Sequence, residues 1–89
     1  MSKKLALILG GNGGIGSSAA RKLIEEGMHV CATYHNNRDQ IGKLQAEFSS
    51  DDITDYRCNS MNSEEITKTV SDIRDSFGNI DVVVFTLTS

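Results

Sequence analysis

Leu5-Ala6-Leu7-Ile8-Leu9, followed directly by Gly10-Gly11-Asn12-Gly13-Gly14-Ile15-Gly16, is the stretch that decides the fold of this 89-residue chain. Its first five residues are all apolar, which predicts a strand buried on both faces of a sheet. Five of the next seven are glycines, which predicts a turn in which side chains would obstruct the backbone. A ligand close to that backbone would explain the glycines, and the pyrophosphate of a nucleotide is the first candidate.

Length and charge limit what the rest of the chain can be. Its 89 residues suffice for one small domain with a single core. The formal net charge is -3, and the scattered Lys and Arg are outnumbered by Asp and Glu. This balance argues against binding to nucleic acid or to an anionic membrane. The apolar start is too short for an export signal or a membrane span, so we expect a cytoplasmic protein.

The two cysteines indicate neither a disulfide framework nor a metal site. Cys31 and Cys58 each fall inside a predicted strand, and no CxxC or Cys/His spacing is present. We therefore expect both to be buried, reduced thiols.

Strand-like and helix-like periodicities alternate along the chain. Short apolar runs bounded by polar residues or glycine predict strands at 5–9, 28–34, 53–58 and 80–85. Three intervening segments carry apolar residues at helical spacing, namely Ile15, Ala19 and Leu23, then Ile41, Leu44 and Phe48, then Ile66, Val70, Ile73 and Phe77. We expect Gly27 and Gly78 to end the first and third helices.

Two of the predicted helices begin with the spacing of a capping box. Asn37 precedes Gln40 by three residues at the second helix, and Asn62 precedes Glu65 at the third. We therefore expect both asparagines to be N-caps.

The alternation predicts an α/β fold, a Rossmann-like doubly wound parallel sheet with helices on both faces. The expected strand order is 3-2-1-4, and ligands bind such sheets at the carboxyl ends of the strands near the crossing point, where the glycine turn lies. The fourth strand, Val82-Val83-Val84-Phe85, would form an exposed edge although its composition is that of a central strand. We therefore expect residues 1–89 to be the first part of a longer protein.

The glycines fit two phosphate-binding spacings. Gly11-x-Gly13-x-x-Gly16 matches the dinucleotide fingerprint, and Gly10-x-x-x-Gly14-x-Gly16 matches a wider one. Gly10 would make the tight turn, Gly13 or Gly14 would let the phosphate approach, and Gly16 would let the helix lie against the sheet. A glycine turn that binds no ligand is the alternative.

The chain resembles the N-terminal half of short-chain dehydrogenases/reductases, especially the 3-oxoacyl carrier-protein reductase branch. The likeness is carried by the glycine stretch and by the segments Glu25–Val30, Arg57–Ser60 and Phe77–Val84. It implies a nicotinamide dinucleotide as cofactor, bound by residues of the glycine turn that include Asn12. It also implies that the Ile15 N–H donates to phosphate and that Asn59 and Ser60 pass along the adenine ring. Asn59 otherwise simply ends a strand.

Two positions depart from the pattern of that family. Leu9 stands where the family usually has Thr, which removes a hydroxyl that helps to hold this region together. Phe85-Thr86-Leu87-Thr88 stands where the family has Asn-Asn-Ala-Gly beside the nicotinamide ribose. The resemblance therefore predicts altered cofactor geometry at that end of the site.

The residues after the second strand favour NADP(H) over NAD(H). No carboxylate occurs in Tyr34-His35-Asn36-Asn37-Arg38, where an NAD site places an acid near the ribose hydroxyls. Arg38 and His35 would face a 2′-phosphate instead, and Tyr34 lies beside them. A solvated Arg38 is the plain alternative. Gly13, in contrast, occupies a place where many NADPH-dependent relatives carry Arg, which removes one expected phosphate contact.

The catalytic residues of the resembled family cannot be assigned in this chain. The family uses a Ser and a Tyr-x-x-x-Lys pair, whereas Tyr34 is followed four residues on by Arg38 and Tyr56 by Ser60. One hypothesis is therefore a carbonyl or hydroxyl oxidoreductase, homo-oligomeric at full length, whose catalytic half follows Ser89. A second is a catalytically silent nucleotide-binding or structural partner domain. A third is another doubly wound domain, such as a flavodoxin-like one.

Overall fold

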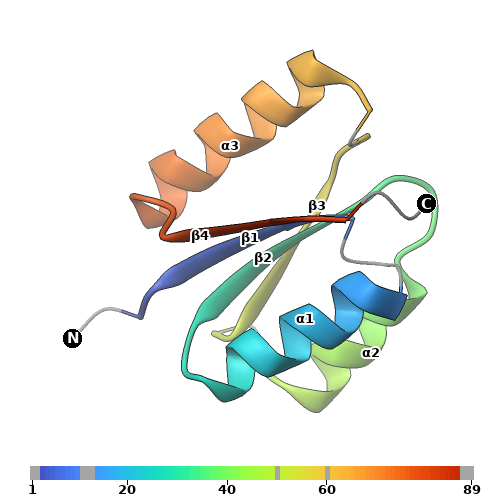
Figure 1. The fold of residues 1–89 in the computed structure, drawn as a ribbon, viewed down its shortest axis with the longest axis vertical. Coiled ribbons are helices and arrows are strands. Elements are labelled where there is room, and N and C mark those ends of the chain that lie inside the picture. Colours follow the sequence, from blue (N-terminus) through green and yellow to red (C-terminus); the bar gives the residue numbers. More distant parts are fainter. Residues whose placement is uncertain (1–2, 11–13, 50, 60, 87–89) are drawn as a thin grey trace.

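A computed structural model describes residues 3–10, 14–49, 51–59 and 61–86 of the chain. Strands and helices alternate throughout, in the order β1 (Leu5–Leu9), α1 (Gly14–Glu25), β2 (His29–Tyr34), α2 (Asp39–Glu47), β3 (Ile53–Arg57), α3 (Ser63–Phe77) and β4 (Val82–Phe85). The strands form one parallel sheet in the order β3-β2-β1-β4 (Figure 1). The predicted Rossmann-like order 3-2-1-4 is confirmed.

β1 lies inside the sheet because it pairs with β2 on one side and with β4 on the other. Asp81 fixes the start of the β1–β4 pairing. Its carboxylate Oδ2 accepts from the Leu5 N–H at 2.8 Å, and its own N–H donates to the Leu5 carbonyl at 2.8 Å. The sheet therefore sets where β1 ends and where the glycine turn begins.

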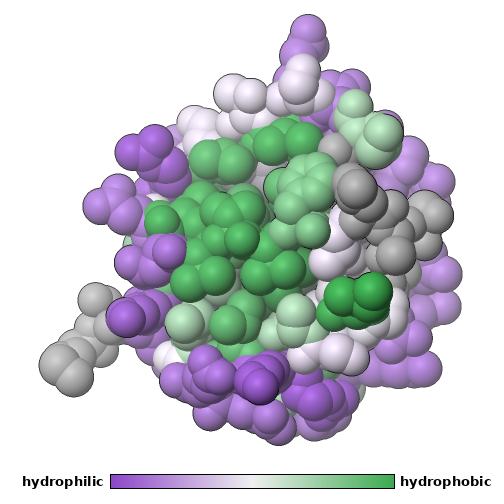
Figure 2. Space-filling model, in the orientation of Figure 1, coloured by the Kyte–Doolittle hydropathy of each residue, from purple (hydrophilic) through white to green (hydrophobic). Residues whose placement is uncertain are grey.

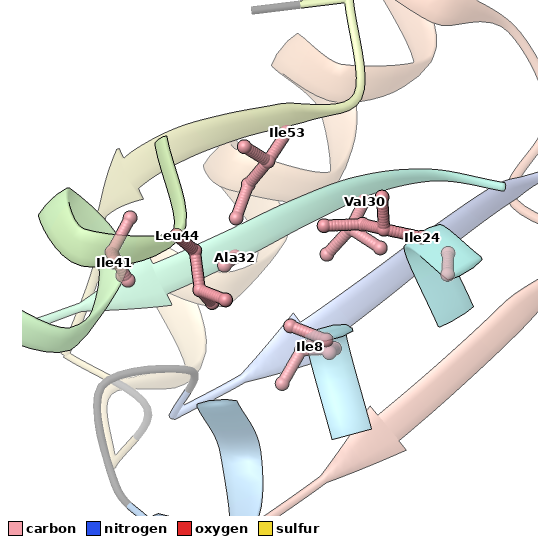
Figure 3. Packing of buried hydrophobic residues seen from close by; sticks show 9 residues of the cluster. Ile8, Ile24, Val30, Ala32, Ile41, Leu44 and Ile53 are labelled. Atoms are coloured by element: carbon pink, nitrogen blue, oxygen red, sulfur yellow. The ribbon is translucent and has the colours of Figure 1, made fainter. Parts of the chain in front are cut away.

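The helices form a layer on each face of the sheet. α1 and α2 lie together on one face, and α3 covers the other (Figure 1). The face under α1 and α2 is filled by aliphatic side chains, among them those of Ile8, Ile24, Val30, Ala32, Ile41, Leu44 and Ile53 (Figure 3). Leu5, Leu7, Leu9 and Cys31 pack with Ile73 on the α3 face. Both faces of β1 are thus buried, as its unbroken apolar sequence predicts.

α1 meets the sheet along a line one position away from the predicted stripe. Gly16, Ala20 and Ile24 are its buried residues, whereas Ile15 is 66% exposed. The prediction that Ile15 belongs to the apolar face is therefore wrong. Small residues at the first two buried positions let the start of the helix approach the sheet closely, and this contact turns Ile15 outward.

The N-cap of α2 is also shifted by one residue from the prediction. Arg38 occupies the cap position and makes no capping hydrogen bond with its side chain. Asn37 Oδ1 instead accepts from the Asp39 N–H at 2.8 Å, which is the hydrogen bond of a turn that precedes the helix.

α3 begins and ends as its sequence predicts, with one difference. Asn62 Oδ1 accepts from the N–H groups of Glu64 and Glu65, at 3.0 and 3.2 Å. The Glu65 carboxylate, however, accepts from the N–H of Asn59 rather than that of Asn62, at 3.0 Å. Gly78 ends the helix with φ of +98°, a backbone conformation that favours glycine.

Both cysteines are free and buried, as the sequence predicts. Cys31 lies in the centre of β2, and burial raises the pKa of its thiol to about 12. Within the described part of the chain, no helix is long and apolar enough to cross a lipid bilayer.

β4 forms an edge of the sheet and is covered on one face only. Val82 and Val84 pack toward α1 and α2, whereas Val83 is 58% and Phe85 51% exposed. Figure 2 shows apolar side chains gathered over this side of the molecule, bordered by hydrophilic ones. The predicted position of β4 at an edge of the sheet is therefore confirmed, and its continuous apolar sequence, unlike that of β1, is buried on one face only. An edge strand of this composition is prone to pair with further chain.

The cap of α3 provides a test of the fold. We expect Asn62→Ala to lower the free energy of unfolding by about 1 kcal/mol, because two N–H groups lose their acceptor. Ser63→Ala, one residue further on, is the matched control and should change it by less than about 0.5 kcal/mol. Urea denaturation followed by circular dichroism measures both. Equal stabilities of the two variants would contradict the assigned cap.

Candidate cofactor site

The predicted binding residues lie at one end of the sheet, where the carboxyl ends of the strands meet. Since all four strands are parallel, the segments that leave β1, β2 and β3 start at the same edge, and the residue after β4 lies there too (Figure 1). Gly10 leaves β1 with φ of +90°, a conformation that a residue with a side chain rarely adopts. The turn that was predicted from the glycines therefore begins at Gly10. Asn12 and Gly13 lie outside the described residues.

Two threonine hydroxyls hold the end of β1 from both sides. The Gly10 N–H donates to Thr33 Oγ1 of β2 at 2.9 Å. Thr86 Oγ1, directly after β4, lies 2.9 Å from the Leu9 carbonyl and 3.0 Å from the Gly10 carbonyl. Both threonines are buried. The backbone is thus anchored at the point where it leaves the sheet.

The N-terminus of α1 follows the turn and is open to a ligand. Gly14 is the first helical residue and is exposed, and a Cβ built on it meets no atom within 4 Å. The first turn of the helix carries no acidic residue. Unpaired N–H groups and the helix dipole favour an anion at such an end. Ile15 has its side chain in solvent, and Gly16 is buried against the sheet.

The residues after β2 carry positive charge, but Arg38 is already paired. Its Nε donates to Asp55 Oδ2 of β3 at 3.0 Å, and its guanidinium lies 6.0 Å from the centroid of the Tyr34 ring. His35 is exposed, and its carbonyl accepts from Arg57 Nε at 3.2 Å. The structure thus brings Tyr34, His35 and Arg38 together and adds Arg57 to the group.

Asn59 lies two residues after the end of β3 and shapes the turn into α3. Its Oδ1 accepts from the Met61 N–H at 2.9 Å, and its N–H donates to Glu65. The alternative in which Asn59 ends a strand is wrong in detail, because β3 ends at Arg57, and a contact of Asn59 with adenine stays a prediction. Ser60 lies outside the described residues.

The comparisons with known proteins agree with this geometry. Residues 4–86 match the family model for short chain dehydrogenase. The chain belongs to the short-chain dehydrogenase family. The predicted family resemblance is confirmed, and with it an oxidoreductase fold of a family that uses nicotinamide dinucleotides.

Comparison with individual short-chain dehydrogenases shows what share of their length this chain covers. The human dehydrogenase/reductase SDR family member 11 is 36% identical over 87 residues, which is 91% of this chain and 32% of that protein. The 3-oxoacyl-(acyl-carrier-protein) reductase FabG of Staphylococcus epidermidis is 29% identical over 83 residues, or 91% of this chain and 34% of the reductase. The structure of ElxO with NADP bound is 30% identical with a TM-score of 0.81, and the match covers 96% of this chain and 35% of ElxO. The chain therefore spans about a third of the length of these relatives.

The two departures from the short-chain dehydrogenase pattern, at Leu9 and at Phe85-Thr86-Leu87-Thr88, lie next to each other in the structure, because Thr86 bonds the Leu9 carbonyl. Leu9 is buried against α3 and contributes no hydroxyl to the turn. The hydroxyl that bonds the turn comes instead from Thr86, which lies within the second departing segment. Leu87 and Thr88 of that segment lie outside the described residues.

The roles of four residues of the site were missed from the sequence. Thr33, Asp55 and Arg57 were not assigned to the site, and Thr86 was noted only as a departure from the family pattern, because each acts on a residue of a neighbouring strand or loop. Their one sequence signal is position, since each lies within or just after a predicted strand.

The Thr86 hydroxyl provides the test of this anchoring. We expect Thr86→Val, which keeps the shape of the side chain, to lower the free energy of unfolding by about 1 to 2 kcal/mol, because it removes the one O–H donor that the Leu9 and Gly10 carbonyls share. Thr67→Val on the exposed face of α3 is the matched control, with an expected change below about 0.5 kcal/mol. Urea denaturation measures both. If the variants were equally stable, Thr86 would not anchor the turn.

Proposed function

We propose that residues 1–89 are the dinucleotide-binding, N-terminal half of an oxidoreductase that acts on carbonyl or hydroxyl groups. The observation that carries this proposal is the exposed N-terminus of α1 at Gly14, with open space where a side chain would stand and no acid in the first turn. A phosphate can approach such N–H groups closely. The match of residues 4–86 to the short-chain dehydrogenase family supports it.

NADP(H) is the proposed cofactor, in preference to NAD(H). Arg38 lies over Tyr34 at the end of β2, Arg57 donates to the His35 carbonyl that follows it, and no carboxylate occurs in Tyr34–Arg38 itself, although Asp55 of β3 pairs with Arg38. A 2′-phosphate is attracted by these guanidinium groups, whereas an acid at this place would repel it. ElxO, which is 30% identical, has a structure with NADP bound. When bound, NADPH supplies a hydride, and this chain supplies its binding and orientation.

The residues of this chain do not form the catalytic acid. A tyrosine that donates a proton near neutral pH needs a lowered pKa. Tyr56 packs against the apolar cluster under α3, and burial raises the pKa of its hydroxyl. Neither Tyr34 nor Tyr56 is followed by Lys at the fourth position. We therefore place the Ser and the Tyr-x-x-x-Lys of the active enzyme in residues after Ser89.

A catalytically silent relative is the second candidate function. The departures at Leu9 and at Phe85-Thr86-Leu87-Thr88 favour it, because they alter the part of the site nearest the nicotinamide ribose. Dinucleotide binding without turnover of any carbonyl substrate, in a parent gene without Tyr-x-x-x-Lys, would favour this candidate. For both candidates we propose a cytoplasmic protein that forms a homo-oligomer at full length.

Gly14 provides the test of cofactor binding. We expect Gly14→Val to weaken NADPH binding at least about tenfold, because the new side chain occupies the approach to the helix N-terminus. Its stability should change by less than about 0.5 kcal/mol, since the position is exposed and its φ is ordinary. Nicotinamide fluorescence titrated against the full chain, with any residues that follow Ser89 in the parent gene, measures binding.

Gly78→Ala is the matched control for this experiment. Its φ of +98° predicts a loss of about 1 to 2 kcal/mol in stability, without an effect on NADPH affinity well below the unfolding temperature. Tight binding of NADPH to Gly14→Val would contradict the proposed site. Absence of binding to the unsubstituted protein would contradict the proposed function itself.

A further inference from the structure

We propose that Asp55 tunes the choice between NADPH and NADH, because its carboxylate competes with the 2′-phosphate for Arg38. This inference rests on the proposed function and names a residue that determines its cofactor specificity. Asp55 lies in the middle of β3, opposite Ala32 of β2. It was absent from the sequence prediction because it belongs to a strand, whereas the predicted phosphate contacts follow one.

A closed set of hydrogen bonds joins Asp55 to Arg38 and Gln45. Arg38 Nε donates to Asp55 Oδ2 at 3.0 Å, and Gln45 Nε2 donates to Asp55 Oδ1 at 3.1 Å. Arg38 Nη2 completes the set by donating to Gln45 Oε1. Each side chain contacts the other two. Two nitrogens of the guanidinium are therefore engaged within the protein.

This arrangement keeps the guanidinium beside the end of β2. It lies over the ring of Tyr34, the last residue of that strand, and its Nη1 would lie 3.9 Å from a Cβ built on Gly42 of α2. The Arg38 side chain is 46% exposed and that of Asp55 is 28% exposed. A phosphate in solvent can therefore reach the guanidinium, but it meets a cation that is already paired with an anion.

The charge of Asp55 opposes a phosphate more strongly than it opposes a ribose hydroxyl. A 2′-phosphate is close to a dianion at neutral pH, so a carboxylate on the far side of Arg38 repels it, whereas a 2′-hydroxyl has no net charge. Arg57 Nε donates to the His35 carbonyl, so a second guanidinium lies near the end of β2 and is not hydrogen-bonded to Asp55 in the described contacts. Asp55 therefore limits chiefly the contribution of Arg38.

Asp55→Asn removes the charge and keeps both the size of the side chain and an oxygen for Arg38. We expect it to lower the dissociation constant of NADPH about fivefold and to change that of NADH less than about twofold. The gain should shrink as NaCl rises from about 20 mM to about 300 mM, because salt screens the removed repulsion. Nicotinamide fluorescence with the full chain, including any residues after Ser89 in the parent gene, measures both constants.

Asp52→Asn is the matched control. Asp52 also forms an ion pair, with Lys3 at 2.7 Å, but it precedes β3 at the opposite end of the strand. The control removes one negative charge and should leave the ratio of the two dissociation constants unchanged. In an Arg38→Gln background, Asp55→Asn should lose most of its effect on NADPH, because the two residues act on one interaction.

The outcomes separate the inference from the proposed function. Unchanged or weaker NADPH binding by Asp55→Asn, with NADPH still bound by the unsubstituted protein, would overturn the role of Asp55 alone. Equal gains for Asp55→Asn and Asp52→Asn would also overturn it, since net charge would then suffice. If the unsubstituted protein bound neither NADPH nor NADH, the proposed function would fail first.

Discussion

The hydroxyl groups of Thr33 and Thr86 hold the end of β1 from both sides, and the geometry of the site depends on them. A central strand that enters a glycine turn exposes backbone groups that no strand can pair. Here the Gly10 N–H donates to Thr33 Oγ1 of β2, and the hydroxyl of Thr86, just after β4, lies within hydrogen-bond distance of the Gly10 carbonyl and of the Leu9 carbonyl, which also accepts from the Thr86 N–H. The turn therefore leaves the sheet in a defined direction although its glycines impose little conformation of their own.

The packing of α1 against the sheet also fixes the position of the helix N-terminus. Gly16 and Ala20 let the helix lie close to the sheet, and Ile24 packs into the cluster formed with β2 and α2. With β1 anchored at its end and α1 seated on the sheet, the N–H groups at Gly14 face the approach to the site without a side chain in front of them. Binding of an anion then requires little ordering of the protein, which favours affinity.

The sequence predicts the fold well because its signals are local. The apolar run of Leu5–Leu9, the cap at Asn62 and the glycine at the end of α3 each determine an element within a few residues, and the alternation of elements determines the strand order. The predictions of burial fail where exposure of a side chain depends on a neighbouring element. Ile15 is exposed because the contact line of α1 depends on the sheet beneath it. Val83 is exposed because nothing in the described part of the chain covers its side chain.

The site was predicted in outline and missed in its contacts for the same reason. Gly10, Gly14 and Gly16 have a recognisable spacing, and Tyr34, His35 and Arg38 follow a predicted strand. The partner of Arg38 is 17 residues away in the chain, and the hydroxyl that bonds Gly10 from β4 is 76 residues away. Such contacts depend on register between strands, which hydrophobic periodicity does not specify for a single side chain.

The proposed function depends on binding of a dinucleotide pyrophosphate at the N-terminus of α1. Amide resonances of the isotopically labelled full chain, recorded while NADPH is added, test this binding most directly. We expect the largest shifts at the N–H groups of Gly14, Ile15 and Gly16, with little change at Gly27 and Gly78. Saturating NADPH that shifts resonances elsewhere and leaves those three unchanged would contradict it.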